Sequence, residues 1–169
     1  MNVRDATVQD SAGLARVQVD SYRRAYAGIF PASYLAHFTY EAQEQDWRDL
    51  LTSATEDVLC VAEVEPGEIV GYALGRPGAT EVAPYDSELV ALHVRRASQG
   101  QGVGRQLLKA MAERLKQRGC ASLMLWVLEE NPSRVLYEHL GGRLLDAKQT
   151  SQGAVEVAYG WASIEGLGE

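Results

Sequence analysis

The segment that decides the fold is Gln99-Gly100-Gln101-Gly102-Val103-Gly104-Arg105. It lies between an apolar run at 88–94, expected to be a buried strand, and an amphipathic basic stretch at 102–118, expected to be a helix. Three glycines at alternate positions let the backbone turn tightly and direct successive N–H groups at one point. The N-terminus of the helix adds unpaired N–H groups and a partial positive charge. The segment therefore predicts a pyrophosphate-binding site.

Three other interpretations of the glycine segment compete with this one. A P-loop would close with Gly-Lys-Ser/Thr, but Gly104 is followed by Arg105 and Gln106. A Rossmann fingerprint requires glycine where Arg105 stands, although Glu129 would supply its acidic partner. Only about 40 residues follow the strand expected at 122–128, which is too few for the rest of a doubly wound sheet. The third alternative is a glycine-rich turn that binds nothing, and the basic helix after it disfavours this.

Charge is distributed unevenly along the 169 residues. The formal net charge of -7 argues against sequence-independent binding of nucleic acid. The segment 41–90 holds twelve acids against two bases, whereas 91–120 holds seven bases against one acid. The basic segment contains the glycine motif, so charge and backbone geometry both favour an anion there. The acidic segment favours a cationic second ligand, with a merely solvated acidic face as the alternative.

The hydrophobic pattern predicts a single domain over 1–169, an α/β fold with a mixed α+β sheet. A hydrophobic content of 46% is enough for one core without disulfide or metal staples. The expected order is β-α-α-β-β-β-α-β-α-β-β, a central mixed, mostly antiparallel sheet flanked by helices and parallel only around the crossover helix. Strands are expected at 3–6, 58–64, 69–74, 88–94, 122–128, 143–146 and 154–161, and helices after Asp10, at 41–51, at 102–118, and from Asn131-Pro132 to Gly141.

The remaining composition indicates a cytoplasmic protein without a metal. Cys60 and Cys120 lie in apolar runs, as expected of two buried thiols in a reducing compartment. The sequence contains neither an apolar signal core nor an apolar run long enough to span a membrane. His37, His93 and His139 do not show metal-ligand spacing, and no Gly-x-Ser-x-Gly elbow occurs.

The glycine segment is the first of two motifs that carry a family resemblance. Gln99, Gly102 and Gly104 fit the pattern Arg/Gln-x-x-Gly-x-Gly/Ala, directly after the 88–94 strand. The second motif is Asn-Pro-Ser-Arg-Val-Leu-Tyr-Glu-His-Leu-Gly-Gly at 131–142. Together they resemble the acetyl-CoA-binding core of the GCN5-related N-acetyltransferase (GNAT) superfamily, whose second motif usually ends in Gly-Phe. The stretches 21–31 and 156–161 are similar to a bacterial subgroup that includes polyamine acetyltransferases.

The resemblance implies acetyl-CoA as co-substrate. Its pyrophosphate would sit on the N–H groups of 100–105, and the 88–94 strand would pair with the pantetheine amides and polarise the thioester carbonyl. Asn131 would contact the pantetheine arm and cap its helix, with capping alone as an equal alternative. The expected cofactor-binding residues are Leu92, His93, Val94, Gln99, Gly100, Gln101, Gly102, Val103, Gly104, Arg105, Asn131 and Arg134.

Two catalytic residues are expected from the same comparison and from the chemistry of acyl transfer. The resemblance implies that Tyr137 lies beside the thioester sulfur. A phenol with a pKa of about 10 stays protonated beside a thiol of about 8.5 and can protonate the leaving thiolate, although Tyr137 could also merely pack at the sheet edge. Glu88 is the candidate base, through a water, because an amine with a pKa of about 10 must lose a proton. Tyr22 and Tyr26, one helical turn apart, would line the acceptor pocket or belong to the core.

These inferences predict an N-acetyltransferase that moves an acetyl group from acetyl-CoA to a primary amine by direct attack in a ternary complex. The acidic segment favours a small cationic amine or a polyamine as the acceptor. The alternatives are a protein or peptide N-terminal acetyltransferase and a non-catalytic module that binds acyl-CoA. Nucleic acid and membranes are not expected as partners, and a homodimer would be common for such folds by analogy.

Overall fold

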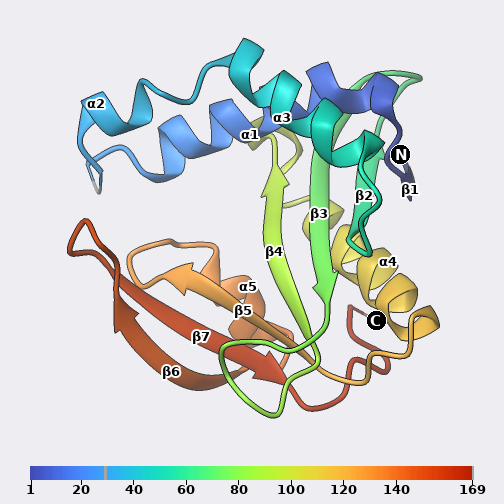
Figure 1. The fold of residues 1–169 in the computed structure, drawn as a ribbon, viewed down its shortest axis with the longest axis vertical. Helices are drawn as coiled ribbons and strands as arrows, with labels where there is room; N and C mark the ends of the chain where they lie inside the picture. The colour runs from blue at the N-terminus through green and yellow to red at the C-terminus, as the bar shows by residue number, and fades with distance from the viewer. Residues whose placement is uncertain (29, 169) are drawn as a thin grey trace.

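The computed structural model describes residues 1–28 and 30–168, and one sheet runs through most of it (Figure 1). The strands are β1 (Asn2–Asp5), β2 (Val58–Glu63), β3 (Ile69–Pro77), β4 (Ser87–Val94), β5 (Leu123–Leu128), β6 (Arg143–Gln149) and β7 (Val155–Trp161). Their spatial order is β1-β2-β3-β4-β5-β7-β6, and among the described residues β4 and β5 form the one parallel pair. This order confirms the mixed, mostly antiparallel sheet and is incompatible with a doubly wound Rossmann sheet.

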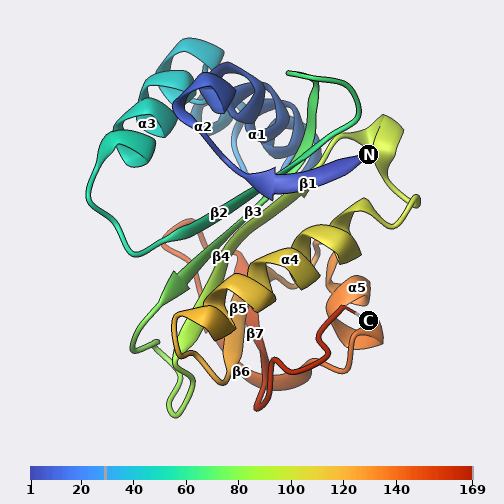
Figure 2. The same cartoon turned by 90° about the vertical axis from the view of Figure 1, so that its right-hand side faces the viewer.

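Helices cover both faces of the sheet. They are α1 (Ser11–Ala25), α2 (Ala32–Leu35), α3 (Tyr40–Thr52), α4 (Val103–Gln117) and α5 (Arg134–His139). Figure 2 shows α1 and α3 on one face and α4 crossing the other. Two buried clusters correspond to these layers, one between α1, α3 and strands β2–β3, and a larger one between α4 and strands β2–β5 and β7.

Helix α4 packs closely on the sheet because its apolar positions recur at helical spacing. Leu107, Leu108, Met111 and Leu115 are fully buried against the strands. Gly75 of β3 lies beneath them, and a Cβ added there would come within 2.8 Å of Met111 Sδ. This contact requires the smallest side chain at position 75.

Strands β4 and β5 are joined at one end and separate beyond it. Glu88 lies opposite Met124, the one parallel register pair found between them in the described chain. A register shift opposite Leu74 and Gly75 leaves Val90 as an extra residue in β4, and such a bulge bends a strand away from its neighbour. The result is an open cleft between the two strands on the far side of Glu88.

A network of hydrogen bonds holds the closed end of this cleft together. Asp86, just before β4, accepts hydrogen bonds from Ala121 N–H (2.9 Å), Ser122 N–H (2.8 Å) and Ser122 Oγ (2.8 Å). The Ser87 hydroxyl donates to the Ser122 carbonyl at 2.5 Å. These bonds tie the residues that begin β4 to those that precede β5.

Two local expectations need correction. The helix expected from Asn131-Pro132 begins at Arg134, and its N-cap is Ser133 rather than Asn131. Asn131 Oδ1 instead accepts the Ser133 N–H at 2.9 Å, and this Asx turn holds the chain outside the helix for three residues. The short helix α2 was not expected, because the Gly and Pro residues around it are typical of a loop.

Candidate active site

A cavity of about 580 Å³ fills the cleft between β4 and β5. Figure 1 shows the two strands spreading apart from their shared end. Residues 89–94 of β4 and 125–128 of β5 form opposite walls, the N-terminus of α4 lies at one end, and α1, α5 and the start of β7 complete the lining. A volume of this size is typical of small-molecule and cofactor pockets.

The α4 end of the cavity is built from backbone N–H groups. Gly100 (φ +73°) and Gly102 (φ +80°) adopt left-handed conformations that other residues reach only with strain. In the described part of the chain, the N–H groups of residues 102–105 donate no hydrogen bond, as expected for the first turn of a helix. Gly100, Gly102, Val103, Gly104 and Arg105 all line the cavity. This cradle fits a pyrophosphate, because it offers several converging donors and the positive end of the α4 dipole.

The two glutamines of the glycine segment stabilise the loop itself. Gln99 Nε2 donates to the Val94 carbonyl at 2.9 Å, and Gln101 Nε2 donates to the Ala97 carbonyl at 2.8 Å. Gln99 lines the cavity, whereas Gln101 lies outside the lining. The Gln101 side chain therefore holds the loop in shape.

The edge of β4 that faces the cleft is open. Leu92, His93 and Val94 pair with β3 on one side and line the cavity on the other. An open strand edge can bind an extended amide chain through its N–H and C=O groups, as in strand addition. Asn131 lines the opposite side, and its side-chain Nδ2 makes no hydrogen bond within the described residues.

Tyr137 stands in the wall of the cavity on α5. Its side chain is buried, and burial raises the pKa of its phenol to about 12. The ring packs edge-on to Trp161 at 6.3 Å and lies 6.5 Å from the Tyr159 ring. Its hydroxyl has no hydrogen-bond partner in the described chain, unlike that of Tyr159, which donates to Glu138. Tyr137 is thus a protonated donor held beside an open cavity.

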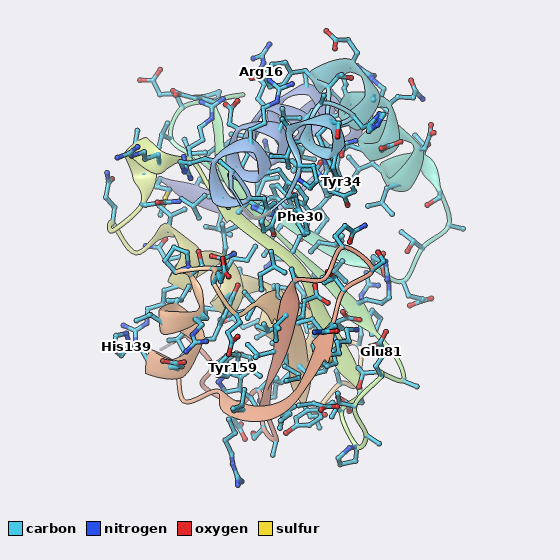
Figure 3. The ribbon with its side chains drawn as sticks, turned by 90° about the vertical axis from the view of Figure 1, so that its left-hand side faces the viewer. Arg16, Phe30, Tyr34, Glu81, His139 and Tyr159 are labelled. Atoms are coloured by element: carbon cyan, nitrogen blue, oxygen red, sulfur yellow. The ribbon has the colours of Figure 1, made fainter. Side chains whose placement is uncertain are left out.

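Five aromatic side chains form a closed ring that supports the cavity wall on the α1 side. Tyr22, Tyr26, Phe30, Tyr34 and Phe38 recur every four residues, and successive ring centroids lie 4.8–5.8 Å apart. Phe38 closes the ring on Tyr22 at 4.8 Å. Figure 3 labels Phe30 and Tyr34 below the helical layer. The ring ties α2 to the end of α1 and fixes the two tyrosines, 22 and 26, that line the cavity.

Glu156, the second residue of β7, lies on this part of the cavity wall. Burial raises the pKa values of Tyr22 and Tyr26, and the negative charge of Glu156 contributes to both shifts. Tyr137 also contributes to the shift of Tyr26. The carboxylate of Glu156 is therefore close enough to Tyr22 and Tyr26 for its charge to act on both phenols.

His93 lies between two tyrosine rings, with Tyr22 and Tyr72 each 5.3 Å away. Burial and, to a smaller extent, the positive charge of Arg24 lower the pKa of its imidazole to about 4. The imidazole is therefore neutral at physiological pH. Its ring forms part of the cavity wall beside Arg24.

Three expected site residues lie outside the cavity lining: Glu88, Gln101 and Arg134. Glu88 is half-buried at the closed end of the cleft, next to Leu89, which does line it, and burial raises the pKa of its carboxyl. Arg134 donates to the Glu129 carbonyl at 3.2 Å and lies 3.6 Å from Glu138.

Two of the three charged residues in the cavity lining, Arg24 and Glu156, were not singled out from the sequence, whereas Arg105 was. None of the twelve acids of segment 41–90 belongs to the lining, whereas Glu156 and Arg24 do. No sequence signal marks these two, because the spatial order β5-β7-β6 and the path of α1 bring them together. Among the described residues, no group of three or more potential ligands is placed to hold a metal ion, and no helix is long and apolar enough to cross a membrane.

Comparison with known proteins agrees with this geometry. A model of the acetyltransferase (GNAT) family matches residues 19–141. The chain belongs to the GNAT family. As a GNAT protein it is an acetyl-CoA-dependent N-acetyltransferase, and the family, fold and enzyme class predicted from its sequence are confirmed.

Individual GNAT proteins are similar over most of the chain. The N-acetyltransferase YuaI of Bacillus subtilis is 34% identical over 170 residues, covering 99% of this chain and 96% of that protein. The [ribosomal protein bS18]-alanine N-acetyltransferase of Haemophilus influenzae is 27% identical over 116 residues, covering 65% of this chain and 76% of the relative. The PaiA N-acetyltransferase of Thermoplasma acidophilum, solved in complex with coenzyme A, has a TM-score of 0.69 at 16% identity and covers 95% of this chain and 98% of its own.

Proposed function

We propose that this GNAT protein acetylates the primary amine of a small cationic molecule, by direct attack on acetyl-CoA in a ternary complex. The observation that carries the proposal is the hydroxyl of Tyr137, which has no hydrogen-bond partner among the described residues and lines a cavity whose wall also holds a phosphate cradle and the carboxylate of Glu156. These are the groups that acyl transfer from a thioester to an amine requires.

The cradle and the open edge of β4 would hold the co-substrate. The free N–H groups of 102–105 bind its pyrophosphate, and the edge at Leu92–Val94 pairs with the pantetheine amides and donates an N–H to the thioester carbonyl. Asn131 Nδ2 is available for the pantetheine arm. Arg134 would join these contacts only by leaving the Glu129 carbonyl.

Proton transfers are assigned to two residues. As the C–N bond forms and the C–S bond breaks, Tyr137 Oη gives its proton to the sulfur, and its high pKa keeps that proton in place until then. Glu88 receives the amine proton through a water at the closed end of the cleft. Burial raises the pKa of Glu88 toward neutral pH, and a general base is more effective when its pKa is near the working pH.

The acceptor would enter beneath the circle of five aromatic side chains that includes Tyr22 and Tyr26. Glu156 offers a carboxylate for an ammonium group, and the faces of Tyr22 and Tyr26 attract a cation. A protein N-terminal amine is the second candidate, favoured by the similarity to the bS18-alanine acetyltransferase.

The test measures free thiol released from acetyl-CoA with a panel of amines: polyamines, monoamines, amino acids and short peptides. Turnover of small amines above the rate of acetyl-CoA hydrolysis is expected. Turnover of peptides alone would favour the second candidate, and binding of CoA without turnover of any amine would refute the proposed reaction.

A further inference from the structure

The acceptor end of the cavity carries two opposite charges from different elements. Arg24 extends from the last turn of α1, and Glu156 lies near the start of β7. Neither side chain forms a salt bridge or hydrogen bond within residues 1–28 and 30–168, although most of the other arginines of the chain are paired with acids or carbonyls. Both residues line the cavity, Glu156 half-buried and Arg24 exposed, and neither is paired with another described residue.

The two charges occupy different positions along the cavity. Glu156 lies on β7 opposite Leu128 of β5, and its charge contributes to the raised pKa values of Tyr22 and Tyr26. Arg24 lies by His93 of β4, on the α1 side of the wall. The neutral imidazole of His93 leaves the positive charge of Arg24 unneutralised.

The other cation in the lining has a different place. Arg105 lies in the first turn of α4, at the phosphate cradle, where an anionic co-substrate would neutralise its charge. Arg24 lies on α1, outside this cradle, and would repel a second ammonium group of a polyamine. An unpaired guanidinium instead matches a carboxylate, which it binds through two parallel N–H donors.

We propose that the acceptor is a small amino acid-like zwitterion whose amine is held by Glu156 and whose carboxylate is held by Arg24. This inference rests on the proposed N-acetyl transfer and narrows its acceptor class from cationic amines to amines that also carry an anionic group.

The test compares amines that differ only at the far end. The wild-type protein is assayed with amino acids whose amine and carboxylate are separated by one to five methylene groups, and with monoamines and diamines of matched length. We expect at least one amino acid to exceed its matched amines in kcat/KM by roughly tenfold to a hundredfold, as one charge-assisted contact provides. The length that is preferred reports the separation of Arg24 from the reacting centre.

Variants connect this preference to the two charges. Arg24→Gln should abolish the preference for the carboxylate, and Arg24→Glu should shift the preference to diamines. Glu156→Gln should raise the KM of every amine. Arg16→Gln is the matched control, because Arg16 is an exposed arginine of the same helix outside the cavity lining (Figure 3). Melting temperatures verify that each variant is folded.

Calorimetric titration of acceptors into the CoA-loaded protein provides a readout that does not need turnover. Tighter binding of the amino acid than of its matched amines, lost in Arg24→Gln, supports the inference. Acetylation or binding of amines without any carboxylate preference would overturn the inference while leaving the proposed N-acetyl transfer intact. A rise in the KM of acetyl-CoA in Arg24→Gln, with acceptor preference unchanged, would assign Arg24 to the co-substrate and also overturn it. Absence of both turnover and binding for all amines would refute both.

Discussion

Glu88 of β4 lies directly opposite Met124 of β5, and the two strands are paired at this one position in the described chain. The cavity begins at Leu89, the residue after Glu88, and the bulge at Val90 bends β4 away from β5. The position that closes the sheet thus also carries the proposed base. In the proposed mechanism, a base there would reach the reacting amine from the closed end, while co-substrate and acceptor would enter from the open side.

The closed end depends on Asp86. Burial opposes the charged form of its carboxylate, but the hydrogen bonds from Ala121 and Ser122 outweigh burial, so its pKa is lowered. Asp86→Ala should reduce the free energy of unfolding by about 2–3 kcal/mol at pH 7, because two backbone donors lose a charged acceptor. Chemical denaturation as a function of pH checks this.

The contribution of Asp86 to the free energy of unfolding depends on pH. A carboxylate whose folded pKa is lowered stabilises the protein above its unfolded pKa, and this contribution is lost as pH falls through the folded value. The wild-type and Asp86→Ala curves should therefore converge in acid. Ser122→Ala, which removes only the hydroxyl contacts, should cost less. Parallel curves at all pH values would show that the charge of Asp86 does not hold the strands together.

Substitutions of Gly104 test whether the cradle binds CoA, without lowering the stability of the protein. It lies in the first turn of α4, where a Cβ would be 3.5 Å from Leu136 and 3.9 Å from Val94, both in the cavity wall. Gly104→Ala fits this space, whereas Gly104→Leu would fill the cleft. Because both residues are better helix formers than glycine, melting temperatures should be unchanged or higher. Calorimetry should show at least a roughly tenfold loss of CoA affinity for leucine, about 1.4 kcal/mol, and a smaller loss for alanine. Wild-type affinity in Gly104→Leu would exclude this cleft as the CoA site.

Tyr137→Phe should lower kcat by about 10²–10⁴-fold without weakening CoA binding, as expected when a general acid is removed. Its hydroxyl has no partner to lose, so stability should be unchanged. Steady-state kinetics and CoA titration measure the two effects separately.

Tyr159→Phe is the matched control for Tyr137. The Tyr159 hydroxyl donates to Glu138 and lies outside the cavity lining, so this variant should lose stability by about 1 kcal/mol and keep its kcat. If both tyrosine variants retained the wild-type kcat, Tyr137 would not be the acid.

The cradle was predictable because its physics is local. The glycines at 100 and 102 adopt the left-handed conformations that their spacing indicates, and α4 begins at Val103, one residue from the expected start. Helix α5 was misplaced because the side chain of Asn131 satisfies a turn instead of a cap, and both uses are consistent with an Asn-Pro sequence.

The acceptor side was not predictable from local pattern. The spacing of four from Tyr22 to Phe38 is visible in the sequence, but Gly28 and Pro31 interrupt the helix, so periodicity alone did not indicate a closed ring. Glu156 reaches the cavity only because β7 lies between β5 and β6. The acidic segment suggested a pocket that binds a cation. Its carboxylates lie outside the cavity lining, because charge composition does not specify position.

Glu88→Gln tests the proposed base through the pH profile. Burial raises the pKa of Glu88, so the wild-type kcat should fall with decreasing pH below an apparent pKa above that of an ordinary glutamate. Glu88→Gln should lose this acid limb and reduce kcat at pH 7 by about 10²-fold. Glu81→Gln is the control, an exposed acid near Glu88 that pairs with Lys148 (Figure 3). An unchanged acid limb in Glu88→Gln would assign the base elsewhere.

His93 makes the stability of the cavity wall depend on pH. Its folded pKa of about 4 is below the ordinary value of 6.5, so an unfolded chain binds a proton in this interval and the folded chain does not. The free energy of unfolding should therefore be unaffected above pH 6.5 and decrease by up to about 3 kcal/mol as the pH falls to about 4. His93→Gln should remove this part of the slope, whatever its effect on stability at neutral pH. His37→Gln, an exposed histidine outside the cavity, is the control. Denaturation curves for His93→Gln with the same slope as the wild type would mean that His93 takes up its proton in the folded wall, and the neutral imidazole beside Arg24 would then have to be abandoned.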